Sequence, residues 1–265
     1  MASRPTLPPH NRIGEQTLIG VPADWMDHSA LHNLSVDTPN DETLIGVQQR
    51  FKVRFANCAG GRESAGVLVK KMYATRGYKA MTGPLHPERI TLVADVDQSV
   101  IGTLTIGLGR SAPLLAEQLY PTEIAALREQ GCQVCEYTRL AIDGKVRSQR
   151  VIASLFHIAY LYPHHLLGHT DAVIEINPRH ANFYKRMLGF TQVGPERICP
   201  RVNAPAVLMR VNFEFVAQQV LAVGGMCVQP NGTRSLYPFF FSHADEQGIL
   251  ARLTRDPDSP DTETP

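Results

Sequence analysis

Two hydrophobic periodicities alternate along the middle of the chain, and they constrain its fold more than any other feature. Residues 47–57 (VQQRFKVRFAN) alternate apolar and charged side chains with period two, which predicts a half-buried strand. Residues 63–74 then have apolar side chains at helical spacing, and similar changes of period continue to residue 213. The predicted order is strand, helix, strand, strand, helix, strand, helix, strand, helix, strand. This order predicts an α/β (α+β) fold in which helices flank one mixed, mainly antiparallel sheet.

The predicted elements lie in one region of the chain. Strands are predicted at 47–57, 89–95, 100–108, 134–142, 170–176 and 206–213, and helices at 63–74, 120–130, 148–162 and 181–188. We therefore expect a core at residues 46–213. Residues 1–45 contain many prolines and predict a partly disordered arm, whereas residues 214–254 predict a helical C-terminal extension. Residues 255–265 are rich in Pro and Asp and predict a disordered tail.

Composition argues against several classes of function. The chain has 265 residues, a hydrophobic content of 43% and a formal net charge of +1, so we expect a globular protein with a sizeable core and no nucleic-acid partner. The N-terminus lacks the apolar segment of a secretory signal, and no apolar run is long enough to span a bilayer. We therefore expect a cytoplasmic protein without an integral membrane segment. Peripheral contact with a membrane stays open.

The five cysteines include one pair at the spacing of a metal-ligand motif, Cys132 and Cys135. A zinc site needs a second such pair or histidines at suitable spacing, and the sequence has no second pair. The pair also enters a predicted strand, in which successive side chains face opposite sides. We expect buried thiols, no metal site and no tightly bound cofactor.

Two segments carry the functional inference. The first is residues 135–143 (CEYTRLAID), which places Glu136 and Arg139 three residues apart on a predicted strand. The second is residues 176–190 (INPRHANFYKRMLGF), in which the end of a strand is followed by a short helix containing Tyr184. An amine attacks a thioester only as the free base, and a carboxylate can accept its proton. The two segments together indicate acyl transfer from a thioester to an amine.

The order of elements and these two segments resemble the GNAT-type acyltransferase fold over residues 47–213. Within that fold, the chain is similar to long-chain N-acyl amino acid synthases of the FeeM type, which are relatives of the acyl-homoserine lactone synthases. Residues 136–142 resemble the Glu-x-x-Arg-Phe-Ala segment of the lactone synthases, and residues 177–190 resemble the Asn-Pro-x-x-x-x-Phe-Tyr-x-x-x-Gly-Phe segment of acyltransferases. The resemblance implies transfer of a long-chain acyl group to the amine of an amino acid. Two alternatives stay open: an acyl-homoserine lactone-type autoinducer synthase, and a noncatalytic acyl-binding or regulatory module.

The resemblance assigns the first segment to the acceptor. It implies that Glu136 assists deprotonation of the amine; the alternative is a strand-end glutamate paired with a lysine. Arg139 could bind the carboxylate of the amino acid through two hydrogen bonds, or it could hold Glu136 in a structural ion pair. Residues three apart on a regular strand face opposite sides of a sheet. A bulge or the end of the strand is therefore required if both side chains are to reach one site.

Three further groups complete the predicted site. Backbone N–H groups near Leu140 to Ile142 would polarise the thioester carbonyl. In the fold that this chain resembles, Tyr184 protonates the departing thiolate; the alternative is an aromatic packing residue. Asn177 could contact the pantetheine arm of the donor, or it could be only the turn residue before Pro178.

The segment that precedes the long predicted helix bears on the acyl donor. Related acetyltransferases hold the CoA pyrophosphate there with a glycine-rich loop and a helix N-terminus. This chain instead has one glycine and offers Lys145, Arg147, Ser148 and Arg150. We expect these residues to suit the phosphopantetheine of an acyl carrier protein, whose surface is usually acidic, at least as well as acyl-CoA. The alternative is a solvated helix start, and the sequence leaves the amino acid, the acyl length and the oligomeric state open.

Overall fold

The structure, a computed structural model, describes residues 17–22, 50–56, 59–75, 77–78, 88–146, 148–229 and 234–254. Its strands are β1 (Thr17–Pro22), β2 (Arg50–Phe55), β3 (Arg89–Val96), β4 (Ser99–Gly107), β5 (Val134–Ile142), β6 (Asp171–Ile176), β7 (Thr191–Gln192), β8 (Arg197–Cys199) and β9 (Ala204–Asn212). Its helices are α1 (Ala59–Ala74), α2 (Pro121–Glu129), α3 (Gln149–Leu161), α4 (Ala181–Leu188), α5 (Phe213–Val223) and α6 (His243–Thr254). Short helical turns are η3 (Leu115–Gln118), η4 (Tyr162–Leu166), η5 (Pro178–His180) and η6 (Tyr237–Phe239).

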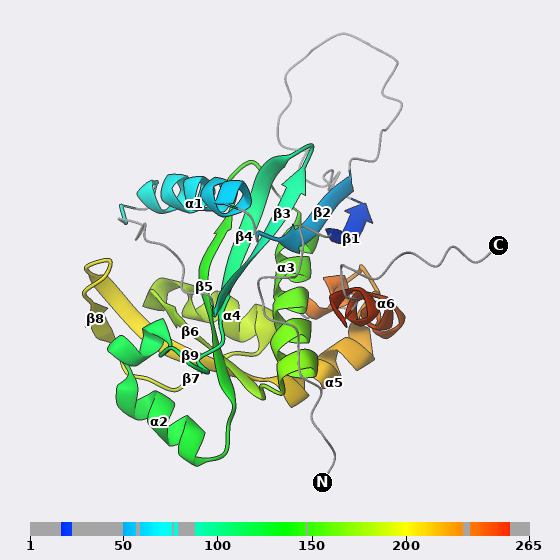
Figure 1. The fold of residues 1–265 in the computed structure, drawn as a ribbon. Helices are drawn as coiled ribbons and strands as arrows, with labels where there is room; N and C mark the ends of the chain where they lie inside the picture. Colours follow the sequence, from blue (N-terminus) through cyan, green and yellow to red (C-terminus); the bar gives the residue numbers. More distant parts are fainter. Residues whose placement is uncertain are drawn as a thin grey trace, which may run out of the picture.

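One sheet organises the described part of the chain. Its strand order is β1-β2-β3-β4-β5-β6-β9-β7, and β8 pairs with β9 beside this path. Neighbouring strands run antiparallel except β5 and β6, which run parallel. Helices cover the sheet, and α5 and α6 form the C-terminal extension (Figure 1). The predicted fold class is therefore confirmed: a mixed, mainly antiparallel sheet with flanking helices and a helical extension.

The two faces of the sheet have separate cores because side chains alternate along each strand. On one face, apolar residues of α3, α5 and α6 pack against the strands in the main core. On the opposite face, α1 and α2 cover smaller apolar clusters. Figure 1 shows α1 and α2 across the strands from α3 and α6. We call these two sides the α3 face and the α1 face.

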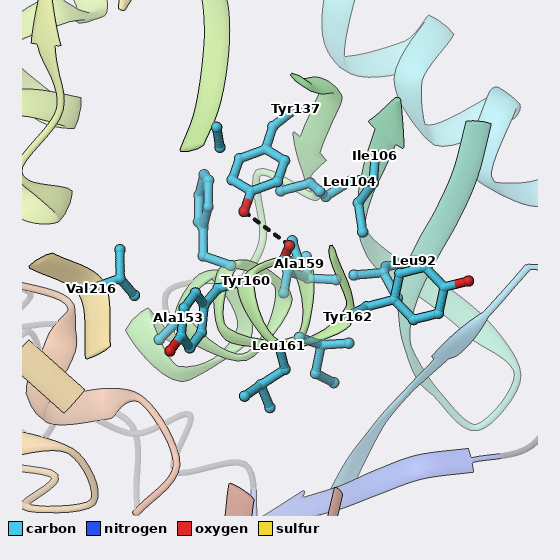
Figure 2. Close-up of a cluster of buried hydrophobic side chains, with 14 of the residues drawn as sticks. Leu92, Leu104, Ile106, Tyr137, Ala153, Ala159, Tyr160, Leu161, Tyr162 and Val216 are labelled. Carbon is cyan, nitrogen blue, oxygen red and sulfur yellow. Dashed lines mark hydrogen bonds between the residues drawn. The ribbon is translucent and has the colours of Figure 1, made fainter. Parts of the chain in front are cut away.

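Helix α3 is apolar around most of its circumference, and it is therefore buried on nearly every side. Figure 2 shows its surroundings, with Leu92, Leu104 and Ile106 of the sheet among the packed side chains. The hydroxyl of Tyr137 on β5 donates a hydrogen bond of 2.9 Å to the backbone carbonyl of Ala159 on α3. This bond fixes the middle of β5 against the helix.

A buried histidine joins the C-terminal extension to the core. His157 of α3 is 0% exposed, and its Nδ1 accepts a hydrogen bond of 2.9 Å from the backbone N–H of Phe241. Nε2 is then the donor to the carboxylate of Glu246 on α6, at 2.8 Å. Burial lowers the pKa of His157, which favours this neutral form of the ring.

The sequence does not predict three of the strands. Strand β1 lies within residues 1–45, for which an arm is expected, and it pairs with β2 while Leu18 enters the core. Strands β7 and β8 have two and three residues, too few to give a periodic signal. By contrast, β5 and α4 have the predicted bounds. The remainder of residues 1–45 and the predicted tail at 255–265 lie outside the described residues. Among the helices of the described segments, none combines the length and the apolar content that a bilayer crossing requires.

Candidate active site

The sheet opens between β5 and β6. These strands pair only over Val134 to Tyr137 on β5 and Asp171 to Ile174 on β6. Beyond that point β5 continues to pair with β4 and β6 with β9, so the two halves of the sheet separate. A cavity of about 410 Å³ lies at the opening, which is within the usual size range of small-molecule sites.

A bulge in β5 lies beside this opening. Thr103 of β4 pairs with Ala141, and Thr105 pairs with Thr138, so β5 has one extra residue between the two pairs. Arg139 lies within the bulge and has a left-handed backbone, with φ of 52°. The bulge is one of the two arrangements that the spacing of Glu136 and Arg139 requires, and both side chains line the cavity. The structure thus brings together two residues that a regular strand would separate.

The cavity is lined from both faces of the sheet. Its walls on the α3 face are mainly apolar, from Leu104, Tyr137, Phe156, Ile174 and Tyr184. Its walls on the α1 face carry charges, from Arg89, Glu136, Glu175 and Arg201 beside Leu115, Ala116 and Cys199. The cavity therefore passes through the sheet. An apolar acyl thioester on one side and a charged acceptor on the other could meet in the gap.

Glu136 is the most buried charged residue of the cavity, with an exposed fraction of 1%. Its Oε1 accepts hydrogen bonds from Arg89 Nη1 at 3.0 Å and from the backbone N–H of Leu115 at 2.8 Å. Its Oε2 accepts one from the N–H of Ala116 at 3.0 Å. Burial raises the pKa of this carboxyl, although these donors and the nearby Arg201 act in the opposite direction. A carboxylate with a raised pKa is a stronger base than one in water.

The ion-pair partner of Glu136 is Arg89, and not a lysine or Arg139 as the sequence suggests. The ion pair joins Arg89 Nη1 to Glu136 Oε1, so neither a lysine nor Arg139 is the cation at this carboxylate. Arg139 is half-buried, and burial together with the positive charge of Arg89 lowers the pKa of its guanidinium. Arg139 therefore adds positive charge to the cavity wall beside the Arg89–Glu136 pair.

Tyr184 and Asn177 both line the cavity. Tyr184 projects from α4 and is 9% exposed, with ring contacts to Phe156 and Phe190. Asn177 caps η5, since its Oδ1 accepts from the N–H of Arg179 at 3.2 Å, and its Nδ2 donates to the carbonyl of Pro205 at 3.2 Å. Tyr184 thus combines packing with access to the cavity, whereas the amide of Asn177 is engaged in the turn.

The remaining predicted residues differ in position. Leu140 lines the cavity, but the side chain of Ile142 does not. The bulge reverses the alternation, and Ile142 packs with the α3 core, where its Cδ1 crowds Gly102. The prediction for Ile142 concerns its backbone N–H group, and that role stays a prediction.

The basic segment lies at the N-terminus of α3. Lys145 is exposed, and its backbone N–H donates to Asp143 at 3.0 Å. Ser148 is the N-cap residue of α3, without a capping hydrogen bond from its side chain. Arg150 in the first turn donates to the sulfur of Cys227 in the C-terminal extension. Arg147 lies outside the described residues. In the described residues, no group of His, Cys, Asp and Glu side chains could hold a metal ion.

Sequence reasoning misses Arg89, Glu175 and Arg201. Their guanidinium and carboxylate groups come from β3, β6 and the turn after β8, and only the folded sheet brings them to one cavity. Glu175 offers the one usable signal, because it is a charged residue inside the apolar run of β6 (DAVIEI). A buried strand favours apolar residues, so such a charge indicates a partner or a function.

A mainly antiparallel sheet that opens between two parallel strands, with a bulge and a cavity at the opening, defines a GNAT-like acyltransferase. Residues 64–212 match the family model of the N-acyl amino acid synthase FeeM. The solved structure of FeeM, an N-acyl amino acid synthase from uncultured soil microbes, is 28% identical, with a TM-score of 0.58 over 65% of this chain and 96% of that chain. The chain belongs to the FeeM N-acyl amino acid synthase family and is an acyltransferase.

More distant structures also align with the chain. A putative N-acetyltransferase from Lactobacillus plantarum is 17% identical, with a TM-score of 0.46 over 62% of this chain and 98% of that chain. The acyl-homoserine lactone synthase LasI is 14% identical, with a TM-score of 0.46 over 62% of this chain and 91% of that chain. A search of curated proteins found no match.

Proposed function

We propose that this protein transfers a long-chain fatty acyl group from a phosphopantetheine thioester to the amine of an amino acid. The observation that carries the proposal is the cavity through the sheet, with apolar walls on the α3 face and charged walls on the α1 face. Apolar walls suit an acyl chain, and a few placed charges fix a polar acceptor. The two halves meet beside the bulge of β5, where the reaction would occur.

The charged half supports roles for Glu136 and Arg139. Arg139 would hold the α-carboxylate through paired hydrogen bonds, with the positive field of Arg89 behind it. Glu136 would accept the proton of the amine directly or through one water molecule. Its Oε2 has the simpler set of partners, a single N–H from Ala116, so it has room for a further donor.

The apolar half supports a direct transfer without an acyl-enzyme. The amine nitrogen would attack the thioester carbonyl carbon, and its proton would pass to Glu136. Backbone N–H groups at the bulge, from Leu140 to Ile142, would stabilise the developing oxyanion. The carbon–sulfur bond would then break, and the hydroxyl of Tyr184 would protonate the departing thiolate.

An acyl carrier protein is the donor that the surface at α3 favours. The exposed Lys145 lies in the loop before α3, and Arg150 lies in its first turn. Met226 and Val228 are 54% and 70% exposed, and they flank Cys227, which is bonded to Arg150. A basic and apolar surface complements an acidic protein that carries the phosphopantetheine, whereas free CoA has no protein surface to meet Met226 and Val228. The proposal includes a cytoplasmic location.

Mass spectrometry of a reaction mixture tests the function. The purified protein would be incubated with a mixture of amino acids and with acyl carrier protein or CoA thioesters of graded acyl length. We expect N-acyl amino acids, with preference for long chains on the carrier protein. Turnover of S-adenosylmethionine to a lactone would identify the alternative synthase, and absence of any N-acylated product with every donor would refute the proposal.

Matched variants test the individual roles. Glu136→Gln should lower kcat by about 10²-fold or more if Glu136 is the base. Glu117→Gln, which alters a carboxylate of η3 outside the cavity, should leave kcat unchanged. Undiminished turnover of Glu136→Gln would remove the assignment of the base alone. Val228→Asp should raise KM for the acyl carrier protein and leave KM for acyl-CoA unchanged; equal effects on both donors would refute docking at this surface.

A further inference from the structure

Two ion pairs line the charged half of the cavity, and the roles proposed above use only one of their two carboxylates. Arg89 pairs with Glu136 at 3.0 Å, and Arg201 pairs with Glu175. One residue of η3 connects the pairs. The N–H of Leu115 donates to Glu136, and its carbonyl accepts a hydrogen bond of 3.0 Å from Arg201 Nη1. The second pair is therefore part of the same charged wall.

Glu175 lies at the point where the sheet opens. Glu136 is aligned with Val173 on the neighbouring strand, and Glu175 is two residues further on and faces the same side. Glu175 is therefore beyond the last paired residue, Ile174, and borders the gap through which the thioester would approach.

The two carboxylates have different surroundings. The oxygens of Glu136 receive three N–H donors, and its side chain is 2% exposed. Glu175 accepts from Arg201 at Oε2, and burial together with the neighbouring Glu175 raises the pKa of the Cys199 thiol. Its side chain is 11% exposed, so it is the more accessible of the two. Arg201 pairs with this carboxylate and holds it at the wall of the cavity.

An amino acid in neutral solution is a zwitterion, and its ammonium group carries three N–H donors. Moving that group into a cavity is costly unless a carboxylate receives it. We propose that Glu175 binds the α-ammonium group of the acceptor and that Arg201 positions Glu175 for this contact. The inference rests on the proposed function and adds the recognition of the acceptor to it.

The two glutamates then have different roles: Glu175 binds the ammonium group, and Glu136 accepts its proton. The ammonium group donates one N–H to Glu175 and directs another towards Glu136, either directly or through one water molecule. Transfer of that proton to Glu136, and from Glu136 to solvent, leaves a neutral amine, which stays hydrogen-bonded to Glu175 with its lone pair free to attack the carbonyl carbon. Glu136 then takes the second proton, which the nitrogen loses as the amide forms, while Tyr184 protonates the departing thiolate. The acceptor therefore needs both an α-ammonium group for Glu175 and an α-carboxylate for the arginines.

A purely structural role for the second pair is the competing explanation, because Arg201 also donates to Gln118 of η3 at 2.9 Å. The chain contains a matched control for it. Arg197 of β8 pairs with Glu123 of α2 through two hydrogen bonds of 3.0 and 2.6 Å, and neither residue lines the cavity. Arg197 thus ties β8 to α2, whereas Arg201 ties the turn after β8 to β6 and, through its other hydrogen bonds, to η3; only the Arg201 pair lines the cavity.

Steady-state kinetics of Glu175→Gln and Glu123→Gln separate the two explanations. At neutral pH, Glu175→Gln should raise KM for the amino acid by about tenfold or more and leave KM for the acyl donor unchanged. Because the variant has no anion for the ammonium group, its KM should fall by about tenfold per pH unit as the free amine becomes more abundant, until the pKa of the amine is reached. The wild type should show a much flatter KM over the same range, and Glu123→Gln should behave like the wild type.

Several results would overturn the inference. A wild-type KM and pH profile in Glu175→Gln would show that Glu175 does not bind the ammonium group. Equal kinetic losses in both variants, with equal losses of Tm, would show a structural role. If the wild type forms no product, the proposed function fails, and calorimetric titration with amino acids still tests Glu175. In that titration, no binding by the wild type, or equal binding by Glu175→Gln, would refute the recognition site.

Discussion

The substitution Gly107→Ala should damage the site although it replaces no charged residue. Gly107 is the last residue of β4 and is paired with Glu136 across the strands. A Cβ atom at Gly107 would lie 2.7 Å from Glu136 Oε1 and 2.8 Å from its Cγ. Contacts below about 3.0 Å do not persist, so the carboxylate must move by roughly 1 Å. That movement pulls Oε1 and Oε2 away from the N–H groups of Leu115 and Ala116.

The expected magnitude follows from these two bonds. A hydrogen bond to a charged group contributes about 1.5–3 kcal/mol, and alanine recovers about 0.4–1 kcal/mol by restricting the unfolded chain. The net loss of stability should be about 3 kcal/mol, or several degrees in Tm. Displacement of a catalytic group by about 1 Å should also lower kcat by about 10²-fold.

Thermal unfolding and steady-state kinetics test this together, with Gly102→Ala as the control. A Cβ at Gly102 meets the flexible ends of Ile142, Leu155 and Val151 at 3.0–3.2 Å, on the α3 face. Gly102→Ala should therefore cost some stability by crowding and leave kcat nearly unchanged. Wild-type kcat in Gly107→Ala, or an equal loss of kcat in both variants, would refute the reasoning that Glu136 acts from a fixed position.

Three further outcomes are expected. Arg139→Gly should keep or raise Tm, because glycine removes a left-handed strain of about 1–2 kcal/mol, while KM for the amino acid rises; a fall in Tm with unchanged KM would contradict both parts. Gly66→Ala in α1, where a Cβ meets nothing within 4 Å, should stabilise the protein by about 0.5–1 kcal/mol in denaturant unfolding without changing activity, and a destabilised variant would show that this site is not open. Burial lowers the pKa of His157 and of His169, so the unfolded chain binds their protons more tightly. Their contribution to stability is complete above the ordinary pKa of about 6.5 and is lost as the pH falls below it, so Tm should fall on acidification from about pH 7 to about pH 5; a constant or rising Tm would contradict the sign.

The local elements were open to prediction because their signals are local. The apolar run of α3 gives its extent, and Gly189 ends α4 with a left-handed φ of 73°, as a helix-stopping glycine does. The strand at residues 134–142 follows from its own composition. The short strands β7 and β8 contain too few residues for any period to be visible, and they exist only because β9 offers them a partner. Strand β1 likewise exists because it pairs with β2. In the sequence the two strands are separated by a proline-containing segment without a regular hydrophobic period.

The site was only partly predictable because its charges come from distant segments. Arg89 and Glu136 are 47 residues apart in the sequence and 3.0 Å apart in space. Hydrophobic periodicity within one segment contains no information about that contact. The sequence therefore suggests partners for Glu136 that are nearer in the chain, such as Arg139. The position of the Ile142 side chain could not be predicted for a related reason. Regular alternation would put it on the α1 face, but the register between β4 and β5 shifts at the bulge and it packs with the α3 core.

The bulge itself explains why the site is hard to predict from regular alternation. A left-handed arginine inside a strand is costly, and a regular β5 would avoid that cost. It would also turn Arg139 to the face opposite Glu136. The strained residue thus gives the strand a feature that regular pairing forbids, because both charged side chains line one cavity. Local rules of sequence and structure fail where the chain departs from regular pairing, and in this chain that departure coincides with the proposed chemistry.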